Sequence, residues 1–240
     1  ILLVVVLVIL LSRRAIDPVV RSAQQQKQFI TDASHELKTP ITVISTSLRL
    51  LEMETGKQKW IDKAQAQTEK LTALVNALVT LSRMDEGVSP PKMEPFALSE
   101  AVTDTAESFR ELARSRGHDL VLHIAPDLTY RGDQYSIRQL VSILLDNAVK
   151  YARADSPITL TLEKTRRGAV LRCRNGSDPI PAETLARLFD RFYRADPSRN
   201  AATGGFGIGL SIARGIAEAH RGSICARMVG EDVEFAAELR

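Results

Sequence analysis

Ser34-His35-Glu36-Leu37-Lys38-Thr39-Pro40 lies inside a run of apolar residues that recur every seven positions. Such a repeat predicts one buried face of an amphipathic helix. The repeat consists of Ile30, Leu37, Ile44 and Leu51, and Ile41 and Leu48 fall on the same stripe. His35 lies off this stripe, so we expect its imidazole on the outer side of the helix rather than in a packed core. No second histidine or cysteine lies four residues away, which argues against a metal site.

A second apolar stripe follows the break at Glu54-Thr55-Gly56-Lys57. It consists of Ile61, Ala64, Leu71, Val75 and Leu78, again at helical spacing. Two such helices joined by a short turn form an antiparallel hairpin, but a single hairpin cannot bury both stripes. Pairing with a second copy of the chain in a four-helix bundle would bury them. We therefore expect a homodimer built on residues 23–86.

The period of the apolar residues changes after Gly87-Val88-Ser89-Pro90-Pro91, which we interpret as an interdomain linker over residues 87–91. Beyond it, Ser99 is a candidate N-cap for a helix that runs to about Ser115, with Gly117 as its stop. The remaining pattern predicts helices over residues 134–152 and after Phe206, and strands over residues 120–124, 158–162 and 170–174 and around Ile224 and Phe235. Helices on one side of a mixed sheet make this part of the chain an α+β layer domain.

Asp146-Asn147-Ala148-Val149-Lys150-Tyr151 follows an apolar run on one of these predicted helices. Asn147 offers a neutral amide oxygen, which is a suitable ligand for Mg²⁺ beside a triphosphate. Lys150 lies almost one turn further on and can meet a phosphate as a point charge. The run therefore predicts the phosphate side of a nucleotide pocket.

A glycine cluster, Gly205-x-Gly207-x-Gly209, precedes Leu210 and opens the next predicted helix. Glycines let the backbone approach phosphates, and the amides of a helix N-terminus add positive potential. The cluster does not follow the strand and turn of a dinucleotide-binding unit. An outward-facing imidazole at His35 and a nucleotide pocket in the same chain together predict a histidine that is phosphorylated.

The residues of these motifs and their order along the chain resemble those of the sensor histidine kinases of two-component signalling. The resemblance covers residues 13–240. The resemblance implies that residues 23–86 form a dimerisation and histidine phosphotransfer domain. It implies that residues 92–240 form a catalytic ATP-binding domain of the Bergerat or GHKL type, an α/β sandwich shared with gyrase, mismatch-repair and heat-shock chaperone ATPases. It also implies ATP and Mg²⁺ as cofactors, phosphotransfer to an aspartate of a response regulator, and phosphatase activity toward that regulator.

In this family the residue at the position of His35 is the phosphoacceptor. Glu36 can accept a hydrogen bond from Nδ1–H and act as the general base, which leaves Nε2 free. Thr39 lies one helical turn on, on the same surface as His35. In kinases with this motif that position helps align water for dephosphorylating the regulator. Pro40 removes a helix hydrogen bond and should bend the helix just past the reactive turn.

The resemblance also assigns residues around the nucleotide. Tyr151 borders the phosphates, and Arg194, at the end of an aromatic block, is the candidate contact to the γ-phosphate. Asn175 and Ile180 stand in the block that reads adenine. There the family usually has Asp-x-Gly-x-Gly, whereas this chain has Asn175-Gly176-Ser177-Asp178-Pro179-Ile180. An amide thus replaces the carboxylate that contacts adenine.

A second departure is Ile143, which stands where many relatives have a first asparagine, four residues before Asn147. Because of these two departures, one alternative stays open: the chain is a non-catalytic relative of these kinases. Such a binding or scaffold protein retains the dimer but has lost turnover. Another alternative is an ATPase of the chaperone or gyrase kind. That group has no phosphoacceptor hairpin, so residues 23–86 discriminate between the two classes.

Ile1 to Leu11 are continuously aliphatic. A bilayer-spanning helix needs roughly 20 such residues, so we interpret residues 1–12 as part of a truncated transmembrane helix and residues 13–22 as a juxtamembrane segment. Basic residues follow at once, which places the rest of the chain in the cytoplasm and the protein at the cell membrane. A signal-peptide core is the competing interpretation, but its basic residues should precede the apolar run.

The composition, with 44% hydrophobic and 25% charged residues, is that of an ordinary globular protein. The net charge is only +3 and the basic residues are scattered, so no nucleic-acid partner is expected. Cys173 and Cys225 lie far apart without a CxxC spacing, and we interpret them as reduced, structural thiols.

Overall fold

The computed structural model describes residues 37–38, 41–54, 56, 58–86, 92–195 and 206–240. The chain divides into two compact units, and the division falls between residues 89 and 90. The described residues do not include the predicted membrane and juxtamembrane segments (1–22), the linker (87–91), or four predicted site residues, namely His35, Glu36, Thr39 and Gly205. Within the described ranges, no helix is both long enough and apolar enough to cross a bilayer.

The first unit contains the predicted helical hairpin. Residues 41–54 are helical, and α2 (Lys59–Glu86) follows after a short turn. Gly56 in that turn has a φ of +73°, a left-handed conformation that glycine adopts without steric cost. Its amide donates to the carbonyl of Glu52 at 2.8 Å. A hydrogen bond of 2.8 Å from Gln65 Nε2 to Glu52 Oε2 joins the two helices.

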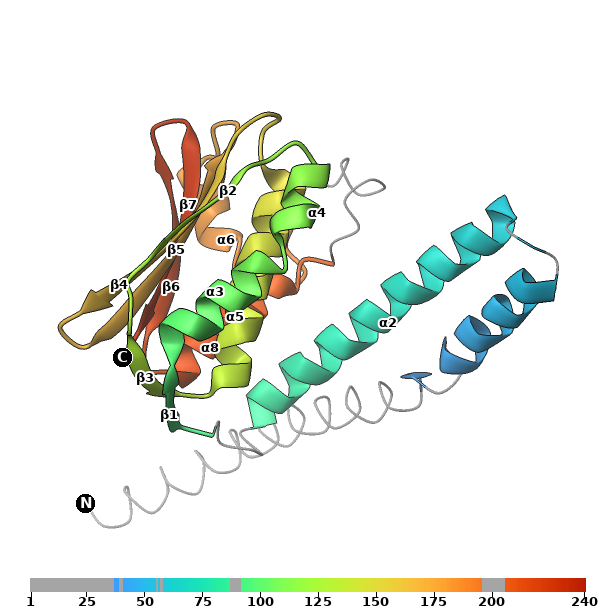
Figure 1. Ribbon diagram of the computed structural model, residues 1–240, viewed down its shortest axis with the longest axis horizontal. Coiled ribbons are helices and arrows are strands. Elements are labelled where there is room, and N and C mark those ends of the chain that lie inside the picture. The colour runs from blue at the N-terminus through green and yellow to red at the C-terminus, as the bar shows by residue number, and fades with distance from the viewer. Residues whose placement is uncertain (1–36, 39–40, 55, 57, 87–91, 196–205) are drawn as a thin grey trace, which may run out of the picture. The chain divides into compact units, whose positions relative to one another are not determined.

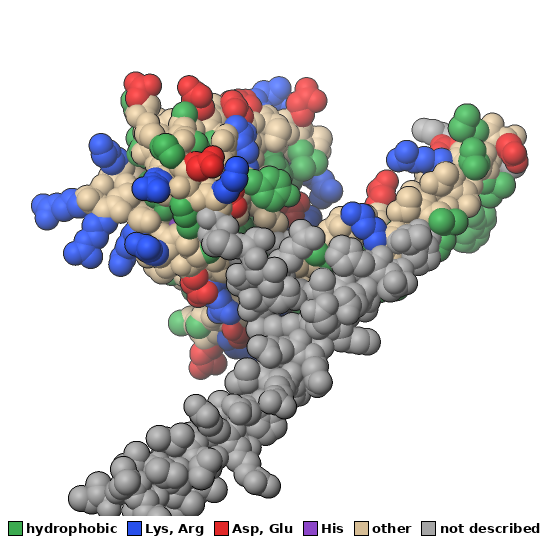
Figure 2. All heavy atoms as spheres, turned by 90° about the horizontal axis from the view of Figure 1, so that it is seen from below, with side chains coloured by type: hydrophobic (Ala, Val, Ile, Leu, Met, Phe, Trp, Pro, Cys, Tyr) green, Lys and Arg blue, Asp and Glu red, His purple; other side chains and the backbone are tan. Residues whose placement is uncertain are grey.

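The hairpin buries only part of its apolar surface. Ile41 and Ile61 are 4% exposed and Val75 is 2% exposed, so these side chains form the seam between the helices. Other apolar side chains of the two stripes stay exposed, namely Leu37, Ile44, Leu51 and Leu71. Figure 2 shows hydrophobic side chains on the surface at the turn end of this unit. One hairpin alone therefore does not bury both stripes, as their pattern predicts.

The second unit is built on a five-stranded mixed sheet. In spatial order its strands are β2 (Leu120–Ile124), β4 (Ile158–Thr165), β5 (Gly168–Gly176), β7 (Asp232–Leu239) and β6 (Ser223–Val229). β2 and β4 run parallel, and the other neighbouring strands run antiparallel. A separate two-stranded ladder pairs β1 (Glu94–Ala97) with β3 (Thr129–Gly132). The strands expected from apolar alternation are all present.

Helices cover one face of the five-stranded sheet. On that face lie α3 (Leu98–Glu107), α5 (Gln134–Tyr151) and α8 (Gly209–Ala219), as Figure 1 shows. Two shorter helices, α4 (Arg110–Ser115) and α6 (Ala182–Arg187), complete this unit in the described part of the chain. The core between the layers includes the buried side chains of Leu144, Leu160 and Leu171. This layer of helices on a mixed sheet confirms the predicted α+β fold.

The prediction for Ser99 was wrong. The helix begins one residue earlier, at Leu98, and it is interrupted after Glu107 instead of continuing to Ser115. The Ser99 hydroxyl donates to the carbonyl of Ala125 at 2.6 Å and accepts from the amide of Leu128 at 2.9 Å. The hydroxyl thus bonds to the connection between β2 and β3 instead of to the amides of its own helix, so these tertiary hydrogen bonds outweigh the local capping preference of serine.

Candidate nucleotide-binding site

Helix α5 carries the first group of predicted site residues. Asp133 caps the helix: Oδ1 accepts from the amide of Tyr135 at 3.1 Å, and Oδ2 accepts from the hydroxyl of Ser136 at 2.7 Å. A cap of this kind stabilises a helix by about 1 kcal/mol. Leu140 and Leu144, both fully buried, anchor the inner face of the helix. This anchoring determines where the last turns of α5 lie over the sheet.

Asn147, Lys150 and Tyr151 lie on those last turns. Asn147 is half-buried, and Tyr151 is 39% exposed. Lys150 Nζ lies 2.6 Å from Asp146 Oδ2 in an ion pair at the surface. Exposed pairs of this kind contribute only about 0–1 kcal/mol. An incoming phosphate can therefore compete with Asp146 for the lysine.

The N-terminus of α8 lies against α5, one turn before Asn147. A Cβ atom built on Gly209 would lie 3.4 Å from Cγ2 of Ile143, so the two helices approach closely here. Ile143, which departs from the family pattern, thus packs on the first turn of α8. Leu210 is buried and anchors the same turn in the core. The first amides of this helix have no intrahelical carbonyl partner, and such a terminus favours an anion.

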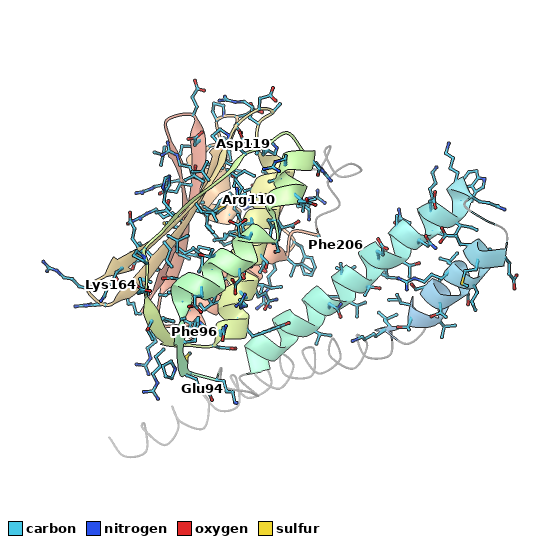
Figure 3. All side chains as sticks on the ribbon, viewed as in Figure 1. Glu94, Phe96, Arg110, Asp119, Lys164 and Phe206 are labelled. Atoms are coloured by element: carbon cyan, nitrogen blue, oxygen red, sulfur yellow. The ribbon has the colours of Figure 1, made fainter. Side chains whose placement is uncertain are left out.

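Gly207 shapes the segment that leads into α8. Its φ is +71°, and its carbonyl oxygen accepts from the amide of Phe192 at 2.8 Å. A Cβ atom on Gly207 would lie 2.7 Å from the carbonyl oxygen of Tyr193. Both the backbone conformation and the available space therefore require glycine. Phe206, at the start of the segment, lies on the opposite side of the unit from Lys164 of the β4–β5 hairpin (Figure 3).

Asn175 lies at the end of β5 and faces the helix layer. Side chains alternate along a strand, so Asn175 shares a face with Cys173, whose Sγ is 3.6 Å from the carbonyl of Leu144 on α5. Asn175 is 1% exposed, and its Nδ2 donates to the carbonyl of Gly176 at 3.0 Å. Its Oδ1 is buried and has no hydrogen-bond partner among the described residues. A purine 6-amino group is a donor that fits this acceptor.

Ile180 and Arg194 lie in connections rather than in helices or strands, and both are half-buried. The aromatic block before Arg194 is well packed. Phe189 meets Phe235 edge to face with 6.3 Å between ring centroids, and the Arg187 guanidinium lies 4.3 Å from the centroid of the Tyr193 ring. This packing positions the segment that holds Arg194.

Two hydrogen bonds between distant segments hold α5 against β5 and α8. The amide of Arg153, just past α5, donates to the carbonyl of Gly176 at 2.8 Å. At the other end of α5, the amide of Asp133 donates to Nε2 of buried His220 at 3.0 Å, and Nδ1 of this ring lies 2.8 Å from the carbonyl of Ile216. The two contacts of the His220 ring together require its neutral tautomer with the proton on Nδ1, because Nε2 accepts and Nδ1 donates. Sequence reasoning missed this role, because no local pattern links His220 to a residue 87 positions away.

The start of α8 at Gly209 thus lies one turn from Asn147 on α5, and Asn175 on β5 faces the same helix layer. The three features are a buried amide oxygen on β5, the N-terminus of α8 and a half-buried amide on α5. In the part of the chain that the structure describes, no cluster of three or more histidine, cysteine, aspartate or glutamate side chains could hold a metal ion.

Two protein families match the chain. Residues 132–240 match the family described as histidine kinase-, DNA gyrase B-, and HSP90-like ATPase, and residues 25–87 match the His Kinase A (phospho-acceptor) domain. The chain is 34% identical over 229 residues to sensor protein DltS of Streptococcus agalactiae, which covers 95% of this chain and 58% of that protein. It is 32% identical over 210 residues to the signal transduction histidine-protein kinase BaeS of Escherichia coli, which covers 86% of this chain and 44% of that protein.

Solved structures show the same fold. Full-length ShkA in complex with AMPPNP matches with a TM-score of 0.73 at 21% identity, over 87% of this chain and 44% of that one. The catalytic domain of the histidine kinase ThkA matches with a TM-score of 0.54 at 26% identity, over 60% of this chain and 92% of that one.

The helix-covered mixed sheet and the match of residues 132–240 define the second unit as an ATP-binding domain of the GHKL class. Because residues 25–87 also match the phosphoacceptor domain, the chain belongs to the sensor histidine kinases of two-component signalling. An ATPase of the chaperone or gyrase kind has no such hairpin, so this alternative is excluded. The chain spans about half the length of the curated relatives it matches, 58% of DltS and 44% of BaeS.

Proposed function

We propose that this chain is the kinase core of a dimeric sensor histidine kinase. ATP phosphorylates His35, and the phosphoryl group then passes to an aspartate of a response regulator. The observation that carries the nucleotide part of this proposal is the buried Oδ1 of Asn175, which has no partner in the described structure. A buried acceptor without a donor costs about 1–3 kcal/mol. A ligand that supplies the donor removes this cost.

In the proposed reaction, Nε2 of His35 attacks the γ-phosphorus of ATP. The bond between that phosphorus and the bridging oxygen breaks, and ADP leaves with the electron pair. Glu36 accepts the Nδ1 proton as the imidazole becomes positive, and base assistance of this kind is worth roughly 10²–10⁴ in rate. Transfer of the phosphoryl group from Nε2 to a regulator carboxylate then frees His35 for another cycle.

Each part of the nucleotide is assigned to a different part of the pocket. Adenine is assigned to Asn175 and Ile180, which follow one another along the end of β5 and the connection after it. The phosphates are assigned to a larger group, namely Lys150, Tyr151, Arg194, the glycines Gly205, Gly207 and Gly209, and the helix that continues through Leu210. The support for this group is the positive φ of Gly207, the exposed terminus of α8 and the weak pairing of Lys150.

Asn147 is assigned to Mg²⁺ as a single amide ligand. Mg²⁺ usually keeps several waters and binds through one or two protein oxygens together with substrate phosphates. A half-buried amide on α5, next to the terminus of α8, fits that requirement. When bound, the ion neutralises charge on the phosphates of the nucleotide.

The dimer and the membrane attachment are proposed from the first part of the chain. The apolar side chains left exposed on the single hairpin support pairing with a second copy over residues 23–86. The aliphatic residues 1–11 and the basic residues that follow support a membrane anchor with the kinase portion in the cytoplasm.

The decisive experiment labels the purified chain with ATP that carries a radioactive γ-phosphate. The parent should take up an acid-labile, base-stable label, as expected for a phosphoramidate, and His35→Gln should take up none while binding nucleotide normally. Thr39→Ala is the matched control on the same surface of the helix. It should be labelled like the parent but should slow the loss of phosphate from the regulator. A labelled His35→Gln protein, or a base-labile label on the parent, would contradict the proposal.

A further inference from the structure

We propose that the second unit carries a cationic surface that binds the anionic headgroups of a lipid bilayer. At the tip of the β4–β5 hairpin this surface contains Lys164, Arg166 and Arg167, and all three side chains are exposed. Together with the exposed Arg131 and Arg221 they form the basic end of the unit. The choice of partner rests on the membrane attachment proposed above, and the inference adds a second contact with the same bilayer.

The fold brings the residues of the basic end together from separate parts of the chain. The turn of the β4–β5 hairpin packs on the last residues of β7. Just past β7, the carbonyl of Arg240 accepts from the hydroxyl of Tyr130 at 3.1 Å, and the amide of Arg240 donates to the carbonyl of His220 at 3.1 Å. Arg131 and Arg221 directly follow those two residues in the chain. Figure 2 shows Lys and Arg side chains gathered at this end, on the left of the view.

The charges at the hairpin tip are not compensated by neighbouring carboxylates. Lys164, Arg166 and Arg167 form no ion pair with any residue that the structure describes. Arginines along the strands differ in this respect, as Arg227 shows by its ion pair of 2.6 Å with Glu234. Paired charges attract an outside anion weakly, whereas a group of unpaired positive charges produces a local positive potential. The hairpin tip is therefore the part of the sheet that attracts anions.

The backbone of the turn does not require arginine. Thr165 and Gly168 pair across the turn, so Arg166 and Arg167 are the two residues that connect the strands. Neither arginine has a positive φ, and neither side chain is buried. Uncharged polar residues fit such a turn equally well. Substitution of the two arginines therefore tests their charge without disturbing the fold.

An anionic bilayer is the partner that the observations favour. Each Lys or Arg near such a surface strengthens binding by about fivefold, and this attraction needs no shaped pocket. Lys164 lies on the opposite side of the unit from Phe206, so the basic end is separate from the segment assigned to the phosphates (Figure 3). Because we propose that the chain is held at a membrane, the bilayer is the polyanion that it meets at the highest effective concentration.

The test is co-sedimentation of the full chain with vesicles of phosphatidylcholine alone or of phosphatidylcholine mixed with phosphatidylglycerol. Arg166→Gln with Arg167→Gln should lower the partition coefficient into the phosphatidylglycerol vesicles by about tenfold or more. Salt at about 0.5 M should abolish this difference. The matched control is Arg114→Gln with Arg116→Gln, which removes the same charge from exposed residues at the end of α4, away from the hairpin tip (Figure 1). That variant should partition like the parent.

Equal partition of the parent and the hairpin variant into phosphatidylglycerol vesicles would overturn the inference, and so would equal losses from the two double substitutions. Binding to the neutral vesicles reports the apolar residues 1–11, so the proposed membrane attachment and this inference can fail separately. A fluorescent duplex oligonucleotide, titrated without vesicles, tests the other common polyanion. If the hairpin variant loses affinity for the duplex but not for phosphatidylglycerol vesicles, the basic end binds nucleic acid and the inference is wrong.

Discussion

At the scale of single residues, the two cysteines show how strongly the environment controls chemistry. Cys173 is fully buried on β5, with Sγ 3.6 Å from the carbonyl of Leu144, and burial raises the pKa of its thiol from 9.0 to about 12. Cys225 lies on the edge strand β6 and is exposed. Only a thiolate reacts readily with disulfide reagents. Cys173 should therefore be protected from such reagents by its burial and by its raised pKa, whereas Cys225 is accessible to them.

We expect dithiobis(nitrobenzoate) at pH 8 to modify one thiol of the native chain rapidly. Cys173 should react only after denaturant exposes it, and Cys225→Ser should remain unmodified until then. Because the folded-state pKa of Cys173 lies above that of the unfolded chain, its effect on unfolding is absent below about pH 9 and lowers the free energy of unfolding between about pH 9 and about pH 12. Rapid modification of two thiols in the native chain would show that the core around Cys173 opens easily.

At the scale of secondary-structure elements, the turn into α8 determines whether phosphate can approach a helix N-terminus. Gly207 has a φ of +71°, its carbonyl accepts from Phe192, and the carbonyl of Tyr193 occupies the space beside it. Gly230, in the turn between β6 and β7, has a similar φ of +64° but open space around it. The two glycines therefore bear the same conformational cost and differ in crowding.

Gly207→Ala should weaken nucleotide binding by about tenfold or more, because a displaced backbone no longer presents the helix amides in line. Gly230→Ala is the control. It should lower thermal stability slightly, by about 1 kcal/mol for a left-handed alanine, and leave nucleotide affinity unchanged. Equal effects of the two substitutions on affinity, measured by calorimetric titration, would show that crowding at Gly207 is irrelevant to the site.

At the scale of the whole molecule, the first unit leaves part of its apolar stripes exposed. Its seam buries Ile41, Ile61 and Val75, whereas Ile44 is 50% exposed and Leu51 is 45% exposed. Full burial of such a side chain contributes about 1.5–3 kcal/mol. In a symmetric dimer these side chains would be buried in both copies. The stabilisation from the stripe would therefore be counted once for each copy.

The double substitution Ile44→Asp with Leu51→Asp should convert the chain to a monomer in sedimentation equilibrium. Val43→Asp is the matched control, because Val43 is 60% exposed but lies off the seven-residue stripe. That variant should remain dimeric. A monomeric parent, or a dimer that survives the double substitution, would mean that another surface covers the exposed stripe.

The features that the sequence predicted correctly are those that follow from patterns among residues close together in the chain. Alternation within residues 120–124 and 158–162 predicted β2 and β4, and the seven-residue repeat predicted a hairpin that cannot bury all its apolar side chains. The motif around Asn147 predicted a helix, and Gly209 opens α8 as expected. Ser99 was assigned wrongly because its hydroxyl bonds to Ala125 and Leu128, more than 25 residues away.

By itself, therefore, the sequence indicated the class of protein, through the resemblance of its motifs to a known family. It also determined the order of the two units, because periodicity depends on residues close together in the chain. Only the tertiary structure decided how Asn175 is oriented, that Ile143 packs on the first turn of α8, and that His220 holds the start of α5. Each of these contacts depends on atoms brought together by the sheet and the packing of helices across it. Local patterns carry no information about which distant carbonyl or ring will meet a given side chain.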